Sequence, residues 1–229
     1  MLTNMEQRLA SFNRKERFLL VGQALGNAAF TLGETFRLQL GDVLKRDVPA
    51  NAYCAMDYHL DWLFAALMWA EGLAHPGNLM ERNVDAGVAG VPEDLKVTGN
   101  QSDIDLLVAW TDERGRGQLA LLEAKGYSSW TNKQMLYKAA RLTAIFGDHD
   151  APRFPDVDAH LVLVGPHPPV GLKLTTPSWA LGPSDGLAKY FLPLDPPPVE
   201  TFVVRRINQD RKPAVTGTHW VIAPSVSPW

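Results

Sequence analysis

The sequence has 229 residues, of which 46% are hydrophobic and 21% charged, and it carries a formal net charge of −3 with a pI of about 6.1. These values predict a globular chain long enough for one large domain or two small ones, and they exclude an overall basic field that would attract nucleic acid. Cys54, the only cysteine, excludes an intrachain disulfide framework and a zinc site built on cysteines, which fits a reducing compartment.

The first part of the chain is predicted to be helical. Residues 5–46 carry apolar side chains at mixed three- and four-residue spacings, with glycines at which a helix could break. A second helix is predicted from Tyr53 to Gly72, and it would place Asp57 and Asp61 one turn apart on one face. Its most apolar run, 62–70, is shorter than the ~20 residues that span a bilayer, and no signal peptide is apparent. We therefore expect a cytoplasmic protein without membrane contact.

Two apolar strands are predicted in the middle of the chain. They run from Asp103 to Trp110 and from Gln118 to Tyr127, and a polar turn with two glycines joins them. Before them the pattern is weak, with only a short candidate strand at 80–84. After them we expect a helix from Thr131 to Phe146 and a buried strand from Ala159 to Val164.

The last part of the sequence differs in composition. Fourteen of the 17 prolines lie at Pro152 or beyond, which excludes long helices there and favours loops with short strands. Thr201–Ile207 and His219–Ala223 are the best strand candidates, and they could pair as an extra hairpin.

Charged residues alternate along the two central strands. Because strand side chains alternate between faces, Glu123 and Lys125 share one face, as do Asp103 and Asp105 on the preceding strand. A hairpin centred near Gly115 sets Asp105 opposite Lys125. A register shifted by two sets Asp105 opposite Glu123 instead and keeps the face. In both registers two carboxylates meet one lysine at the end of apolar strands.

This group of charges is costly to bury unless its members pair or bind a metal. Asp105 and Glu123 would supply the hard oxygen ligands that Mg²⁺ prefers, and Lys125 could orient an attacking water or offset charge at phosphorus. The simpler alternative is a solvent-facing hairpin with a cross-strand ion pair. That alternative explains the alternation but not the apolar residues at the other strand positions.

The run QSDIDLLV, the turn and the run LLEAKGY resemble the PD-(D/E)xK superfamily of restriction-endonuclease-like nucleases. The resemblance covers residues 57–164. It implies that Asp105 is the family's aspartate, Glu123 its acidic metal ligand and Lys125 its lysine. Ile104 stands where the motif's name has proline, a common relaxation in the family.

Further site residues follow from the same resemblance. Gln134, on the helix after the second strand, is similar to a glutamine that some branches carry there. Asp61, with Asp57 as the second choice, would be the acidic metal ligand from the preceding helix. We expect Asp103 to be a surface or turn carboxylate rather than a second metal ligand. Three basic residues of the helix 131–146 could contact phosphates, but they more simply form its solvated face: Lys133, Lys138 and Arg141.

The implied fold is a single α/β domain over residues 1–229, a restriction-endonuclease-like mixed sheet flanked by helices. It would comprise a helical N-terminal elaboration (1–50), a nuclease-like core (53–165) and a proline-rich extension of loops and short strands (166–229). The implied activity is Mg²⁺-dependent hydrolysis of phosphodiester bonds in nucleic acid, with DNA as the expected substrate and Mn²⁺ able to substitute. In-line attack of a metal-bound water would leave 5′-phosphate products.

Two alternatives remain at this point. The first keeps the fold without the chemistry, as a module that binds nucleic acid or a protein partner in a defence or repair system. The second is an interaction protein that forms a homodimer through the helix carrying Trp62 and Trp69, a pair that also reads as a core stripe. The six histidines show no spacing typical of a zinc site.

Overall fold

The structure is a computed structural model. It describes residues 4–13, 15–24, 30–69, 80, 82–85, 94–100, 102–126, 130, 132–148, 151–175, 177–181, 189–195 and 202–224.

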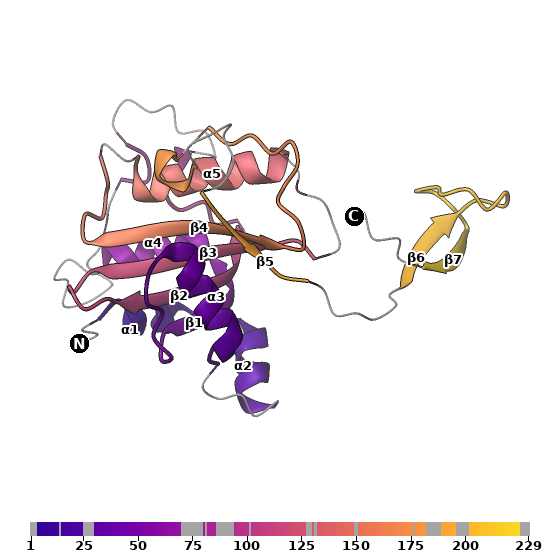
Figure 1. Ribbon diagram of the computed structural model, residues 1–229. Helices are drawn as coiled ribbons and strands as arrows, with labels where there is room; N and C mark the ends of the chain where they lie inside the picture. The colour runs from indigo at the N-terminus through magenta and orange to yellow at the C-terminus, as the bar shows by residue number, and fades with distance from the viewer. Residues whose placement is uncertain are drawn as a thin grey trace.

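The centre of the molecule is a five-stranded mixed sheet (Figure 1). Its strands, which lie side by side in chain order, are β1 (Tyr53–His59), β2 (Asp103–Thr111), β3 (Gly117–Ala124), β4 (Val157–Gly165) and β5 (Tyr190–Pro193). The pairs β1–β2 and β2–β3 are antiparallel, whereas β3–β4 and β4–β5 are parallel. The β2–β3 hairpin therefore lies at the heart of the sheet, with a neighbour on each side.

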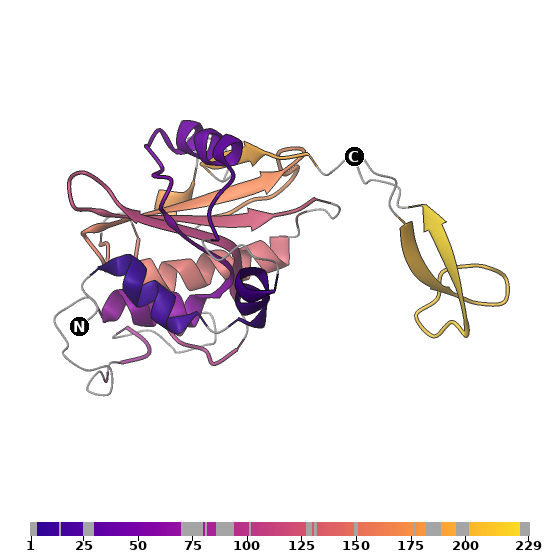
Figure 2. The same cartoon turned by 90° about the horizontal axis from the view of Figure 1, so that it is seen from below.

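Helices cover both faces of this sheet (Figure 2). One face packs against α1 (Met5–Phe12), α4 (Leu60–Met68) and α5 (Asn132–Phe146), and the other packs against α3 (Glu34–Leu44). Because both faces are covered, β3 is buried from Gly117 to Glu123 and reads as a nearly continuous apolar run. The expected mixed α/β architecture with a sheet flanked by helices is confirmed.

The described part of the N-terminal segment forms three helices, which agrees with the prediction of a helical segment that could break at its glycines. α1 ends at Phe12, α2 spans Glu16–Gln23, and α3 begins at Glu34 after the N-cap Gly33. Within the described ranges, no helix is both long enough and apolar enough to cross a membrane.

The predicted helix from Tyr53 to Gly72 is wrong over its first seven residues, which form β1. These residues pair with β2 from Tyr53 opposite Ala109 to His59 opposite Asp103, and α4 begins only at Leu60. The hydrogen bonds that β2 offers decide the conformation of a run whose apolar residues suit either structure. The strand expected at 80–84 is not seen at residues 80 and 82–84, and residue 81 lies outside the described ranges.

The two tryptophans of this region both contact aromatic residues of the same chain. Trp62 lies against the rings of Tyr58 and His59, with ring centroids 5.8 and 4.7 Å away. Trp69 meets Phe12 of α1 edge-on at 5.9 Å. These contacts support the interpretation of Trp62 and Trp69 as residues that pack within their own chain.

The register of the β2–β3 hairpin is the second of the two expected. Leu106 pairs with Leu122 and Leu107 with Leu121, so one further step sets Asp105 opposite Glu123. The prediction that Asp105 faces Lys125 is wrong by two residues. The turn explains the shift: Asp112 Oδ1 accepts hydrogen bonds from the Arg114 and Arg116 amides.

The remaining elements follow the sequence closely, with one exception. α5 and β4 lie where they were expected, and β6 (Phe202–Ile207) and β7 (His219–Pro224) form the extra antiparallel hairpin. β5 was not predicted, because its four residues lie among prolines and gain their pairing only from β4.

Candidate active site

Asp105 and Glu123 lie side by side on adjacent strands of the sheet. Both belong to the face covered by α1, α4 and α5, because each lies two residues along its strand from a leucine of that core, Leu107 for Asp105 and Leu121 for Glu123. Glu123 is 1% exposed, whereas Asp105 is partly exposed. The Ala124 amide donates a hydrogen bond of 2.8 Å to Asp105 Oδ2, which holds this carboxylate against β3.

Lys125 follows directly after β3. Its amide donates to the Val164 carbonyl of β4 at 2.9 Å, so its backbone continues the parallel pairing. Its ammonium nitrogen lies 5.9 Å from the centroid of the Trp130 ring. Asp105, Glu123 and Lys125 thus all lie near one end of β3, and no hydrogen bond or ion pair among the described residues joins the Lys125 ammonium to either carboxylate.

The charges of this group act on one another. Burial raises the pKa of Glu123 to about 7, and the negative charge of Asp105 adds to the rise. The ammonium groups of Lys138 and Lys125 oppose it. Glu123 is thus a buried carboxyl that changes its charge near neutral pH, which is typical of functional sites but also occurs in structural ion-pair networks.

Lys138 of α5 is the main residue that the sequence analysis did not place here. Its ammonium pairs with Glu123 Oε1 and donates a hydrogen bond of 2.5 Å to the Asp103 carbonyl. Lys138 is buried, so the expectation that it belongs to the solvated face of its helix is wrong. The spacing held a signal: Lys138 lies on the same stripe as the buried Met135 and Leu142.

One oxygen of Glu123 remains available. Oε2 is buried and makes no hydrogen bond to any described residue, whereas Oε1 is held by Lys138. A buried carboxylate oxygen without a partner is costly and fits a cation bound beside it.

Asp61, expected as a third metal ligand, lies in a different polar cluster. It lies in the first turn of α4 and accepts hydrogen bonds from the amides of Thr98 and Gly99 and from Arg141 Nη2, at 3.1, 2.8 and 2.7 Å. Arg141 is fully buried, which corrects its expected place on a solvated face, and burial lowers its pKa. Asp61 thereby ties α4 to α5 and to residues 98–99.

The other acidic residues are also engaged. Asp57 lies opposite Asp105 in the β1–β2 register, has the unusual φ of 49° for a non-glycine residue, and pairs with Arg17. Asp103 pairs with Lys15 at 2.8 Å and lies 3.5 Å from His59 Nε2.

Gln134 lies exposed on α5, one turn before Lys138. It therefore lies on the helix that supplies Lys138, and its side chain is open to solvent.

The donor set fits Mg²⁺ in one respect only. Asp105 and Glu123 provide the one or two carboxylates that this ion takes when water and substrate phosphate complete its shell. Among the described residues, no group of three or more His, Cys, Asp or Glu side chains gathers to hold a metal. A metal would thus be held by two carboxylates, one of which also binds Lys138.

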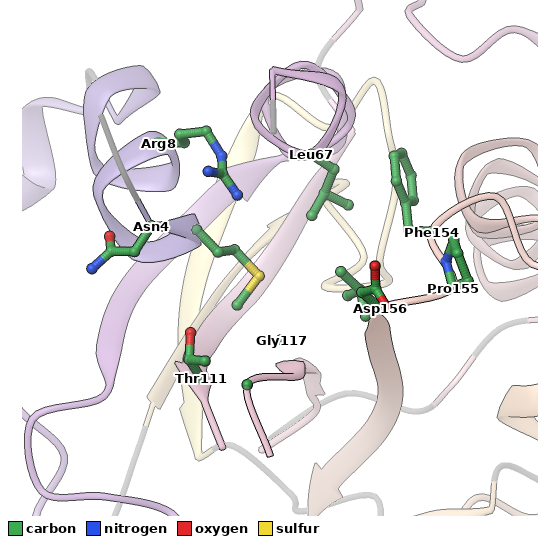
Figure 3. Close-up of a pocket in the computed structure, with 11 residues that line it drawn as sticks. Asn4, Arg8, Leu67, Thr111, Gly117, Phe154, Pro155 and Asp156 are labelled. Atoms are coloured by element: carbon green, nitrogen blue, oxygen red, sulfur yellow. The ribbon is translucent and has the colours of Figure 1, made fainter. Parts of the chain in front are cut away.

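A cavity of about 360 Å³ lies at the other end of the hairpin (Figure 3). Figure 3 shows Arg8 of α1, the N-cap Asn4 of the same helix, Leu67 of α4 and Phe154 around it, with Thr111 at the end of β2. Thr111 is six residues from Asp105, or ~20 Å along an extended strand, so this cavity is not part of the carboxylate site.

Comparisons with known proteins found no match: no family model matches the chain, and no curated protein or solved structure shows significant similarity to it.

Proposed function

We propose that this protein is a metal-dependent nuclease of the PD-(D/E)xK type, with a restriction-endonuclease-like fold, that hydrolyses phosphodiester bonds of nucleic acid, with DNA as the expected substrate. One observation carries the proposal: Asp105 and Glu123 meet across two central strands, and Lys125 follows beside them. These residues lie at the end of a hairpin whose other positions are mostly apolar and buried. A solvated ion pair does not account for a carboxyl as deeply buried as that of Glu123.

Asp105, Glu123 and Lys125 each have a chemical role in this proposal. Asp105 and Glu123 would hold Mg²⁺, which when bound lowers the pKa of a water ligand and polarises a phosphoryl oxygen. The Lys125 ammonium would orient the attacking water and offset negative charge that develops at phosphorus. Gln134, exposed one turn before Lys138, would contact the substrate.

The raised pKa of Glu123 sets the pH at which the site can work. A carboxylate binds a cation only when it is deprotonated, and the pKa of Glu123 is about 7 without such an ion. Metal affinity, and with it cleavage at sub-saturating metal, is therefore expected to fall as the pH drops below about 7.

A second candidate function rests on Lys138 and Arg141. These two buried cations pair with Glu123 and Asp61, two acidic residues that the family resemblance implied as metal ligands. A module that keeps the fold but has replaced the metal with its own ammonium and guanidinium groups would look the same. Such a module would bind nucleic acid or a protein without cutting.

The test is cleavage of a panel of circular and linear DNA and of RNA, with Mg²⁺ and then Mn²⁺, alongside calorimetric titration of both metals. Metal binding with metal-dependent cutting of any substrate supports the nuclease. A folded protein that binds neither metal at millimolar concentration and cuts nothing supports the binding module instead.

A further inference from the structure

The β6–β7 hairpin carries a charge opposite to that of the rest of the chain. Residues 202–224 contain four cations and one carboxylate, Asp210, so their net charge is +3. Because the whole chain has a net charge of −3, the remaining residues carry −6. The cations are Arg205, Arg206, Arg211 and Lys212. The weak overall charge of the protein therefore conceals a basic hairpin.

The same hairpin exposes an apolar face. The register pairs Phe202 with Pro224, Val204 with Ile222 and Arg206 with Trp220, so these six side chains share one face. Four of them are large and exposed: Phe202 at 59%, Val204 at 72%, Trp220 at 66% and Ile222 at 58%.

Nothing in the described part of the chain covers this face. No residue of the hairpin belongs to either core cluster of the sheet domain, and both views show the hairpin standing away from that domain (Figures 1 and 2). A two-stranded hairpin is at best marginally stable alone in water. An exposed face with two aromatic rings on such a hairpin therefore indicates a binding surface.

The tip of the hairpin is held in a defined shape. The Asn208 amide donates to the Lys212 carbonyl and the Lys212 amide donates to Asn208 Oδ1, both at 2.9 Å, and Arg206 Nε donates to the Gly217 carbonyl at 3.2 Å. A Cβ at Gly217 would lie 2.4 Å from the Ile207 carbonyl oxygen, so this close approach requires glycine. Arg206 is thereby fixed beside Trp220.

We infer that the β6–β7 hairpin binds single-stranded nucleic acid. Trp220 and Phe202 offer ring faces on which unpaired bases can stack, and Arg206, with Arg211 and Lys212 at the tip, offers charges for the phosphates. The combination decides the ligand, because a protein partner would need the apolar face but not a net charge of +3 concentrated beside it.

The inference deepens the proposed nuclease, on which it rests, by assigning its substrate strand to a surface outside the carboxylate site. It is tested without metal, so that binding is measured separately from cleavage. Full-length protein is titrated into a labelled single-stranded 20-mer and a 20-bp duplex in EDTA, and fluorescence anisotropy is followed between 50 and 300 mM salt.

Three variants give the expected pattern. Trp220→Ala weakens single-strand binding about tenfold, and Trp220→Phe restores most of it. The double variant Arg211→Gln/Lys212→Gln lowers the slope of log K against log salt by about 1.4, since each phosphate contact on a single strand contributes about 0.7. The control, Lys45→Gln/Arg114→Gln, removes two exposed cations elsewhere and leaves the slope unchanged.

Three results would overturn the inference. They are single-strand binding unaffected by Trp220→Ala, duplex binding as tight as single-strand binding, and no binding at 50 mM salt. A self-association that buries Trp220, detected by light scattering and a blue-shifted emission, would assign the face to a second copy of the chain. Cleavage activity that survives any of these results would leave the proposed nuclease standing and remove only the hairpin's role.

Discussion

Glu123 links the charge state of the site to the stability of the protein. Its pKa is raised by burial from 4.5 to about 7, so the folded state favours the protonated carboxyl. The contribution of Glu123 to stability is therefore fully present below pH 4.5 and is lost as the pH rises through about 7. A shift of this size corresponds to roughly 3 kcal/mol.

The variant Glu123→Gln tests this contribution. The free energy of unfolding of Glu123→Gln minus that of the wild type is expected to rise by about 3 kcal/mol between pH 4 and pH 8, because the variant has no charge to bury. Urea unfolding at a series of pH values measures the difference. A difference that stays constant over this range would contradict the raised pKa.

In the proposed site, Lys138 would compete with a metal ion for Glu123. Replacing Lys138 with Met leaves Glu123 buried without its ion-pair partner, which is expected to cost about 3 kcal/mol at pH 8. If Mg²⁺ binds the same carboxylate, 10 mM Mg²⁺ should recover much of this loss. Thermal unfolding with and without Mg²⁺ measures both effects. Lys133→Met, an exposed lysine on the same helix, is the control and should show neither.

At the scale of elements, Asp61 connects α4, α5 and residues 98–99. Asp61→Asn removes the charge that compensates the fully buried Arg141, so we expect a loss of about 3 kcal/mol in the free energy of unfolding. Mg²⁺ affinity, measured by calorimetry, should not change, because Asp61 does not gather with Asp105 and Glu123. Asp42→Asn, an exposed carboxylate of α3, controls for charge. Lost metal affinity in a fully stable Asp61→Asn protein would restore its predicted role as a ligand.

The elements also show where sequence reasoning succeeds and fails. The spacing of Glu123 and Lys125 predicts their common face because strand periodicity is a local property, whereas the place of Asp105 beside them depends on the register of the hairpin. β1 was missed because its apolar residues suit a helix equally well until β2 supplies hydrogen bonds. Lys138 was missed because a lysine is assumed to be solvated, although its position on the buried stripe of α5 argued otherwise.

At the scale of the whole molecule, the chain consists of a sheet domain and a basic hairpin whose charges oppose each other. Average charge cannot reveal this division, since it sums −6 and +3 into −3. The pairing of β6 with β7 could be predicted from composition, whereas the exposure of Phe202 and Trp220 could not, because it depends on what the hairpin packs against.

The same division predicts that the sheet domain is stable without the hairpin. A chain that ends at Asp195 keeps β5 and both core clusters, so its melting temperature by circular dichroism should lie within about 2 °C of that of the full chain. A large fall would mean that the hairpin packs on the domain in solution.

The central claim is that Asp105, Glu123 and Lys125 form a nuclease site, and its most direct test is cleavage by matched variants. Wild type, Asp105→Asn, Lys125→Ala and the control Lys133→Ala are compared on the same DNA with Mg²⁺, after circular dichroism has shown that each is folded. We expect metal-dependent cutting by the wild type and the control, and a loss of at least a hundredfold in the other two. Cutting by Asp105→Asn and Lys125→Ala at the rate of the wild type would contradict the assignment of the site.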